Sequence, residues 1–371
     1  MPAFLRPDLQ EFAAYSAHPQ ESVGDRPAII DNLDTNECAY DLPAALKEKL
    51  AWAYQHEISA NRYPDGDHGE LRATIAHYTN TSAALGTAVE AAHVTVGNGS
   101  DELIRSLLIA TCVGRSGAIL VAEPTFSMYG ILAETLGVEV VRVGRDADTF
   151  AVDVAAAQTA LDTHATPIRL VFMVSPNSPT GNGLSAAELA WLRQLPEDVL
   201  VVVDEAYFEF SQQTTVAEAI TRPNWVVTRT FSKALRLAAH RVGYAIAHPS
   251  IIQVLEKVRL PYNLPSFSQA AALVALRHGP DLLAVVAEVQ AERERLTAAL
   301  TALPQLQVWP SAANFIYCRP LAQPLAAVFA ALYYQGTHIR QTGGGLRITI
   351  GTPAENTRTL QHMAAALGQP Q

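Results

Sequence analysis

Five apolar, valine-rich runs, separated by segments long enough for a helix, constrain the fold of this chain more than any other feature. The runs read AILVAEP, VEVVRV, IRLVFMVSP, VLVVVDEAY and WVVTRTFS, at residues 118–124, 138–143, 168–176, 199–207 and 225–232. Apolar runs without polar alternation are typical of strands buried on both faces. Strands that alternate with helices form a mostly parallel sheet. The sequence therefore predicts an α/β fold with a large, mostly parallel mixed sheet covered by helices on both faces.

The pattern changes after about residue 260. A connector, PYNLPSF, precedes a long alanine- and leucine-rich helical stretch at residues 268–303. The segments VWPSAANFIYC and GLRITIG then predict strands of a smaller α+β unit. We expect an N-terminal arm at 1–35 that packs on the small domain, a large domain at 36–262 and a small C-terminal domain at 263–371.

Charge and cysteine content exclude several classes of protein. The chain of 371 residues has a net charge of −10, which disfavours nucleic acid and anionic membranes as partners. Cys38, Cys112 and Cys318 form no CxxC pair, so neither a disulfide framework nor a metal site is expected. The N-terminus lacks a secretory signal, and no apolar run reaches the roughly 18 residues of a membrane span. We therefore expect a cytoplasmic protein that acts on small molecules.

Polar residues follow several predicted strands, and ligands of open parallel sheets bind at the carboxyl ends of strands. Lys233 stands in TFSK, and a lysine in a closed apolar site is shifted toward the neutral amine that forms Schiff bases. Asp204 follows three valines, and a carboxylate beside a pyridine nitrogen keeps a proton on the ring. Tyr207, in DEAY, and Asn177, in the SPNSPTG turn, can each form a hydrogen bond to a ring oxygen. Each residue also has a commonplace interpretation, as a surface lysine, a strand-end aspartate, a half-buried tyrosine or a loop asparagine.

A glycine-rich turn predicts an anion site. GNGSD at residues 97–101 joins a strand to a helix, and a helix N-terminus attracts phosphate. Thr230 and Arg241 can add a hydroxyl and a guanidinium to the same phosphate. Phe126 lies near another strand end, where it can stack on a flat ring, although such a residue is more often part of the core.

Together these motifs resemble the fold-type-I, pyridoxal-phosphate-dependent aminotransferases of classes I and II. SPNSPTG, DEAY and TFSK followed by arginine at plus eight are signatures of that family, in its usual order. The resemblance implies pyridoxal 5′-phosphate as cofactor and Lys233, Asp204 and Tyr207 as catalytic residues. It implies a set of cofactor-binding residues that comprises Gly99, Ser100, Asp101, Phe126, Asn177, Asp204, Tyr207, Thr230, Ser232, Lys233 and Arg241.

Within this family the chain is similar to the histidinol-phosphate aminotransferases, through NE at 36–37, NRYPD at 61–65, PSAANFI and GLRITIGTPAEN. That similarity implies transamination between histidinol phosphate and imidazole acetol phosphate, with glutamate and 2-oxoglutarate, in histidine biosynthesis. It also implies a homodimer.

The same similarity assigns residues to the substrate and to the subunit interface. It implies that Tyr63 reaches the cofactor phosphate of the partner subunit. Arg340, Arg347 and Asn36 are the implied substrate-binding residues. Two arginines suit a dianionic phosphate better than a single carboxylate.

Three alternatives share this fold: an aromatic amino acid aminotransferase, a phospho-amino-acid decarboxylase of cobalamin synthesis, and a cofactor-binding regulator. The regulator normally needs an added DNA-binding segment, which neither the short arm nor the acidic charge supplies. The chain departs from the family pattern at Arg236 and His240, where smaller or apolar residues are usual, and in the short QTGGGL segment between the two arginines.

Overall fold

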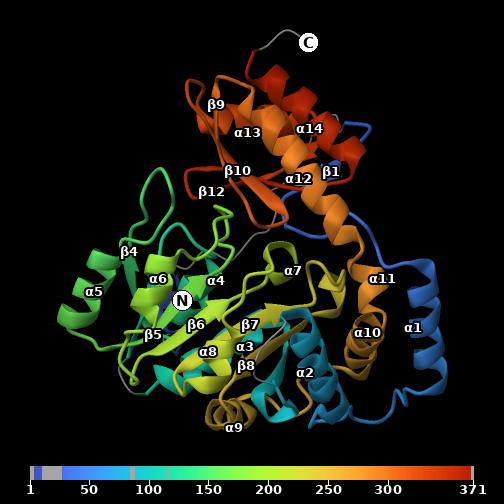
Figure 1. Cartoon of the computed structure of the whole chain (residues 1–371), viewed down its shortest axis with the longest axis vertical. Helices are drawn as coiled ribbons and strands as arrows, with labels where there is room; N and C mark the ends of the chain where they lie inside the picture. Colours follow the sequence, from blue (N-terminus) through green and yellow to red (C-terminus); the bar gives the residue numbers. More distant parts are fainter. Residues whose placement is uncertain (1–3, 11–26, 84–87, 115–116, 369–371) are drawn as a thin grey trace.

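The structure is a computed structural model that describes residues 4–10, 27–83, 88–114 and 117–368. Figure 1 shows a large α/β body below a smaller one, with α12 (Val285–Thr301) running from the first into the second. The large body contains a seven-stranded sheet and the smaller one a four-stranded antiparallel sheet. This architecture confirms the predicted fold class.

The large sheet has the strand order β2-β8-β7-β6-β5-β3-β4. The five predicted runs form β3 to β7, which pair in parallel, whereas β8 is antiparallel to both of its neighbours. The strands are β2 (Val94–Asn98), β3 (Ala118–Ala122), β4 (Glu139–Val143), β5 (Ile168–Val174), β6 (Leu200–Asp204), β7 (Trp225–Thr230) and β8 (Val242–Ala247).

Helices surround this sheet. They are α1 (Ala44–His56), α2 (Gly69–Ala83), α3 (Gly99–Thr111), α4 (Met128–Thr135), α5 (Val154–Thr163), α6 (Ala186–Leu192), α7 (Phe208–Ser211), α8 (Val216–Thr221), α9 (Pro249–Val258), α10 (Ser266–Arg277) and α11 (Gly279–Leu283). Short 3₁₀ turns occupy Pro7–Gln10, Ala91–His93 and Ala238–His240.

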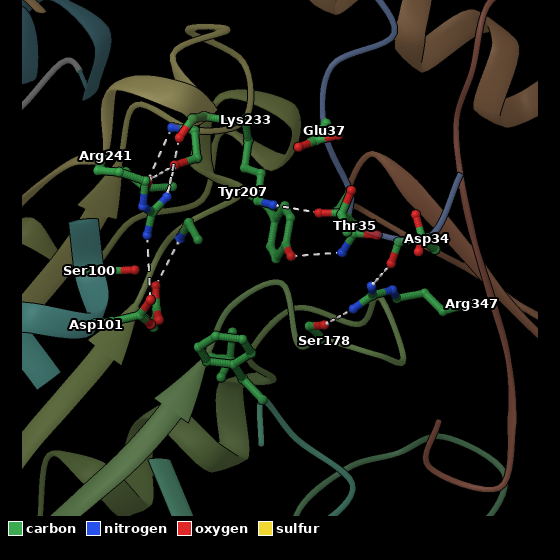
Figure 2. Close-up of a pocket in the computed structure, with 18 of the residues that line it drawn as sticks. Asp34, Thr35, Glu37, Ser100, Asp101, Ser178, Tyr207, Lys233, Arg241 and Arg347 are labelled. Carbon is green, nitrogen blue, oxygen red and sulfur yellow. Dashed lines mark hydrogen bonds and ion pairs between the residues drawn. The ribbon is translucent and has the colours of Figure 1, made fainter. Parts of the chain in front are cut away.

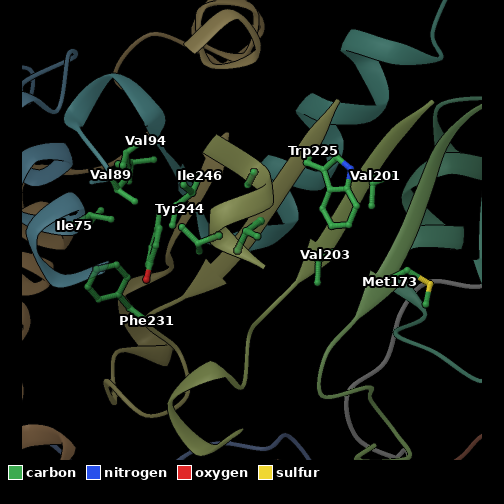
Figure 3. Close-up of a cluster of buried hydrophobic side chains, with 14 of the residues drawn as sticks. Ile75, Val89, Val94, Met173, Val201, Val203, Trp225, Phe231, Tyr244 and Ile246 are labelled. Carbon is green, nitrogen blue, oxygen red and sulfur yellow. The ribbon is translucent and has the colours of Figure 1, made fainter. Parts of the chain in front are cut away.

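Both faces of the large sheet are buried. Val201 and Val203 of β6 lie in a core cluster with Ile75 of α2, shown in Figure 3, whereas Val202 lies in a second cluster with Leu107 of α3. Successive side chains of a strand point to opposite faces, so a strand covered on both sides is apolar throughout. This explains why the valine runs predicted the sheet.

The small body is built from β9 (Leu306–Trp309), β10 (Phe315–Pro320), β12 (Arg340–Thr342) and β13 (Gly345–Thr349), in the order β12-β13-β10-β9. Three helices pack on it: α12, α13 (Leu325–Tyr334) and α14 (Pro353–Ala366). A separate short pair joins β1 (Asp31–Asn32) in parallel to β11 (Thr337–His338).

The helical stretch expected at 268–303 is three helices rather than one. It divides into α10, α11 and α12, and the chain bends by 82° between Ser266–Arg277 and Gly279–Thr301. Gly279 and Pro280 lie at the break, and proline lacks the N–H that a helix interior requires. Within the described residues, no single helix has the length and apolar character of a membrane span, although this bent pair taken together does.

The division into 1–35, 36–262 and 263–371 stays a prediction. Leu264 and Leu282 belong to the core of the large sheet, and the C-terminal residues of the small body's core begin at Val285, so packing favours a later boundary. Residues 1–3 and 11–26 of the predicted arm lie outside the described residues. Of the rest, Asp31 bonds α14 through Arg358, whereas Arg6 donates to the carbonyl of Thr135 in the large body.

Candidate active site

A cavity of about 380 Å³ lies where the carboxyl ends of β5, β6 and β7 meet the small body. Figure 2 shows its walls, which come from segments far apart in the sequence. The lining residues are Asp34, Thr35, Asn36, Glu37, Ser100, Asp101, Phe126, Val174, Ser178, Asp204, Ala206, Tyr207, Thr230, Ser232, Lys233, Ala238, Ala239, Arg241 and Arg347. Most of the residues predicted from the sequence are therefore brought together here.

One end of the cavity has the character of an anion site. Arg241 Nη2 lies 3.4 Å from Asp101 Oδ2 at the first turn of α3, and Thr230 Oγ1 donates to Ser232 Oγ at 3.0 Å. Gly99 has φ +74°, and a Cβ there would stand 2.5 Å from Arg241 Nη2. Glycine therefore lets the guanidinium approach the helix N-terminus, where backbone N–H groups favour a phosphate.

Asp204 lines the cavity near two aromatic side chains, Phe126 and Tyr129. Its Oδ2 accepts a hydrogen bond from Tyr129 at 2.7 Å, and its Oδ1 accepts one from the Ala206 N–H at 3.1 Å. Burial raises the pKa of Asp204 to about 6, against the opposing effect of the Tyr129 hydrogen bond. Phe126 lines the cavity edge-on to Tyr129, with ring centroids 5.4 Å apart.

Lys233 is held across the cavity by the N-terminal segment. Its Nζ donates to the carbonyl of Thr35 at 2.8 Å, as Figure 2 shows. Burial, reinforced by the positive charge of Arg347, lowers the pKa of Lys233 to about 8. The amine is therefore much closer to its neutral, nucleophilic form than an exposed lysine.

Tyr207 receives its hydrogen bond from Asn36. Asn36 Nδ2 donates to Tyr207 Oη at 2.8 Å, and the backbone N–H of Asn36 donates to Thr349 Oγ1 at 3.0 Å. Asn314 Nδ2 donates to the Asn36 carbonyl at 3.1 Å. Asn36 therefore joins the strand-end tyrosine of the large body to β13 and to the residue that precedes β10 in the small one. Burial raises the pKa of Tyr207, so its hydroxyl keeps its proton.

Arg347 projects from β13 on the side opposite Arg241. Its Nη1 donates to Ser178 Oγ at 3.0 Å, and its Nη2 donates to the carbonyl of Asp34 (Figure 2). Arg340 does not line the cavity, but in the antiparallel register of β12 and β13 it lies directly opposite Arg347. Residues directly opposite in an antiparallel pair share a face of the sheet.

Gly99, whose close approach to Arg241 is described above, lies outside the lining, and so do two other predicted residues. Asn177 is buried, with its Nδ2 bonded to Thr180 Oγ1 at 2.6 Å and its Oδ1 accepting from Thr125 at 3.1 Å. Tyr63 is 80% exposed and stacks on Tyr262 with ring centroids 4.6 Å apart. The predicted roles of both residues stay predictions.

Several lining residues were not predicted. Asp34, Thr35 and Glu37 adjoin the predicted Asn36, and Ser178 stands beside Asn177 in SPNSPTG, so the motifs marked their neighbourhood. Tyr129 carries no motif. Tyr129 lies outside the lining but bonds the lining residue Asp204, and the sequence indicated this only through its spacing of three residues from Phe126 at the start of a helix.

The arrangement fits a flat, phosphorylated ring cofactor. Within one enclosed space it offers hydrogen-bond donors for a phosphate at one end, an aromatic side chain, a buried carboxylate and a lysine. Among the described residues, no group of three or more His, Cys, Asp or Glu side chains is placed to hold a metal ion.

Comparisons with known proteins agree with this geometry. The family described as aminotransferase class I and II matches residues 28–363. Histidinol-phosphate aminotransferase 2 of Nostoc sp. is 56% identical, over 99% of this chain and 98% of that protein. Histidinol-phosphate aminotransferase of Thermosynechococcus vestitus is 55% identical, over 100% and 98%. The crystal structure of a Sinorhizobium meliloti histidinol-phosphate aminotransferase in complex with pyridoxal-5′-phosphate shares the fold, with a TM-score of 0.84, 23% identity and 98% coverage of both chains.

Proposed function

The chain belongs to the class I and II aminotransferases, and on that premise we propose that it interconverts histidinol phosphate and imidazole acetol phosphate, with glutamate and 2-oxoglutarate as the other pair. The cofactor is pyridoxal 5′-phosphate, and the reaction belongs to histidine biosynthesis. Full-length relatives that share more than half of their residues with this chain bear the name of this activity.

One observation carries the choice of substrate: the cavity has cationic groups on two opposite sides. Arg241 and the N-terminus of α3 serve the cofactor phosphate on one side. Arg347 lines the other side, with Arg340 paired to it across the sheet. A substrate with its own phosphate uses the second cationic side, because two guanidiniums offer several charge-assisted hydrogen bonds to one dianion.

When bound, the cofactor supplies an electron sink that makes the α-proton of the amino substrate removable. Lys233 is the group that moves this proton, because its lowered pKa of about 8 gives a far larger neutral fraction of the amine near physiological pH than an exposed lysine has. Asp204 would hold the ring nitrogen with its buried carboxylate, and Tyr207, whose hydroxyl accepts a hydrogen bond from Asn36, would donate its own proton to the ring oxygen. Phe126 excludes water from one side of the ring.

We also propose a homodimer in which Tyr63 reaches the partner's cofactor phosphate. Tyr63 and Tyr262 stack on the surface, and other large apolar side chains are exposed along nearby segments. These are Trp52 and Tyr54 of α1 together with Leu260 and Phe267. Exposed apolar groups gathered in this way support a protein–protein contact. Sedimentation of the wild-type protein tests the dimer.

The expected compartment is the cytoplasm. Cys38, Cys112 and Cys318 are all free thiols, and a reducing compartment keeps them so. Fractionation of cells that express the tagged chain tests this placement.

The decisive experiment for the function is a set of initial rates with histidinol phosphate, phenylalanine, tyrosine and O-phosphothreonine as substrates. We expect histidinol phosphate to have the highest kcat/KM and O-phosphothreonine to release no carbon dioxide. A preference for phenylalanine would instead identify an aromatic aminotransferase. Borohydride reduction of the holoenzyme should fix the cofactor to a Lys233 peptide, and fixation on another lysine would contradict its assignment.

A further inference from the structure

The carboxylate of Asp204 is held from the side opposite the cavity by a tyrosine that no motif marks. The Tyr129 hydroxyl donates to Asp204 Oδ2 at 2.7 Å. Tyr129 comes from α4 and has no exposed surface. The ring of Tyr129 is fixed by stacking on Phe172 of β5, with centroids 4.4 Å apart and an interplanar angle of 10°. The hydroxyl is therefore held in place by packing and has little freedom to turn to another acceptor.

The two hydrogen bonds to Asp204 together determine how its carboxylate lies. Oδ1 accepts from the Ala206 N–H at 3.1 Å while Oδ2 accepts from Tyr129. A carboxylate has about four lone-pair sites on its two oxygens, so sites remain for a group in the cavity. A hydrogen bond to the charged form of an acid favours that form, and the effect is strongest where solvent is excluded. Asp204 is 3% exposed.

We propose that Tyr129 is a positioning residue that keeps Asp204 ionised and aimed at the ring nitrogen of the cofactor. This inference rests on the proposed function only insofar as a pyridine-ring cofactor binds in the cavity. It does not depend on which amino substrate the enzyme uses.

The other groups around Asp204 either favour its ionised form less than this hydrogen bond does or oppose it. Asp101 of α3 is a like charge, which disfavours the ionised form of Asp204. Tyr207, which follows β6, receives its own hydrogen bond from Asn36. The Thr228 hydroxyl of β7 lowers the pKa of Asp204 in the same direction as Tyr129 but by less, and the Ala206 N–H is a backbone donor that occupies Oδ1. Tyr129 is thus the side chain whose removal most directly favours the protonated form of Asp204.

The test measures binding of pyridoxamine 5′-phosphate to the apoprotein between pH 5 and 9, for the wild type and Tyr129→Phe. This probe forms no covalent bond with Lys233, and the titration of that lysine is common to both proteins, so it cancels when their profiles are compared. Wild-type affinity should fall tenfold per pH unit below the pKa of Asp204, which burial raises to about 6. In Tyr129→Phe the fall should begin roughly one to two pH units higher, because one charge-assisted hydrogen bond is lost.

Tyr78→Phe is the matched control. Tyr78 is also a buried tyrosine, and it donates to a carboxylate, Glu209, at 2.9 Å outside the cavity lining. Its variant should leave the midpoint of the binding profile unchanged. In an Asp204→Asn background only the step of the probe's own phosphate, which titrates at about pH 6 in every variant, should remain. Adding Tyr129→Phe to that background should cause no further shift.

The outcomes separate a positioning role from a structural one. A Tyr129→Phe profile with the wild-type midpoint, or with an equal loss of affinity at every pH, overturns the proposal. A shift of the same size in Tyr78→Phe also overturns it. If the enzyme proves to use a different amino substrate, the proposed function fails while the binding profiles still decide the role of Tyr129.

Discussion

Replacing Arg340 by alanine should weaken histidinol phosphate far more than histidinol, which lacks the phosphate. Arg347 is already oriented by Ser178 and by the carbonyl of Asp34, whereas Arg340 stands opposite it on β12. Each charge-assisted hydrogen bond contributes about 1.5–3 kcal/mol. Losing one such bond in Arg340→Ala corresponds to a loss of roughly ten- to a hundredfold in kcat/KM. Arg347→Ala removes a guanidinium that lines the cavity itself, so the loss in kcat/KM should be larger.

The assay compares kcat/KM for histidinol phosphate, histidinol and glutamate in the wild type and in each variant. Glutamate should be affected less by Arg340→Ala, because one arginine suffices for a carboxylate. Arg319→Ala is the matched control, since Arg319 lies on the adjacent β10 and its Nε bonds the Gly344 carbonyl at 2.9 Å, in the turn between β12 and β13. If Arg340→Ala leaves the ratio of histidinol phosphate to histidinol unchanged, or if Arg319→Ala lowers it equally, the two-arginine clamp is refuted.

Three further predictions concern stability, assembly and pH. Glu205→Gln should lower the free energy of unfolding of the apoprotein in urea by about 3–5 kcal/mol, because it leaves the buried guanidinium of Arg229 without its counter-charge, and a loss below about 1 kcal/mol would contradict this. Mixing Tyr63→Phe chains with Lys233→Ala chains should restore some activity through hybrid dimers, and inactive hybrids would argue against a shared site. The stability of the wild-type apoprotein relative to Lys233→Met should increase as the pH rises from about 8 toward 10.5, because the unfolded lysine still binds a proton that the folded one has released. A stability difference that does not change with pH, measured by thermal unfolding, would rule out the lowered pKa.

Much of the site was predictable because it depends on a local property of the chain. The run that ends at Asp204 is apolar up to that residue and the run that ends at Thr230 begins with three apolar residues, so they predicted parallel strands buried on both faces. Parallel strands have their carboxyl ends at one edge, which places the residues that follow them in the same cavity. The glycine-rich turn before α3 and the TFSK motif needed no further information to be placed there.

Other parts depended on how distant segments pack, which no local pattern encodes. The hydrogen bond from Asn36 to Tyr207 was not predicted, and the amide of Asn177, whose role at the ring oxygen stays a prediction, bonds Thr180 and Thr125. Asn36 and Tyr207 are 171 residues apart. The helical break at Gly279 was visible in the sequence as glycine and proline, but the resulting direction of α12 was not.

The sequence by itself determined which strands form, which of their ends carry polar groups and which family the motifs resemble, because these follow from residue periodicity and from short motifs. Only the tertiary structure decided which polar groups face one another. The roll of α4 about its axis turns Tyr129 toward Asp204, and the pairing of β12 with β13 sets Arg340 opposite Arg347. Both contacts result from the packing of whole elements against the two cores, since the free energy of burying many side chains fixes an orientation that no single residue specifies.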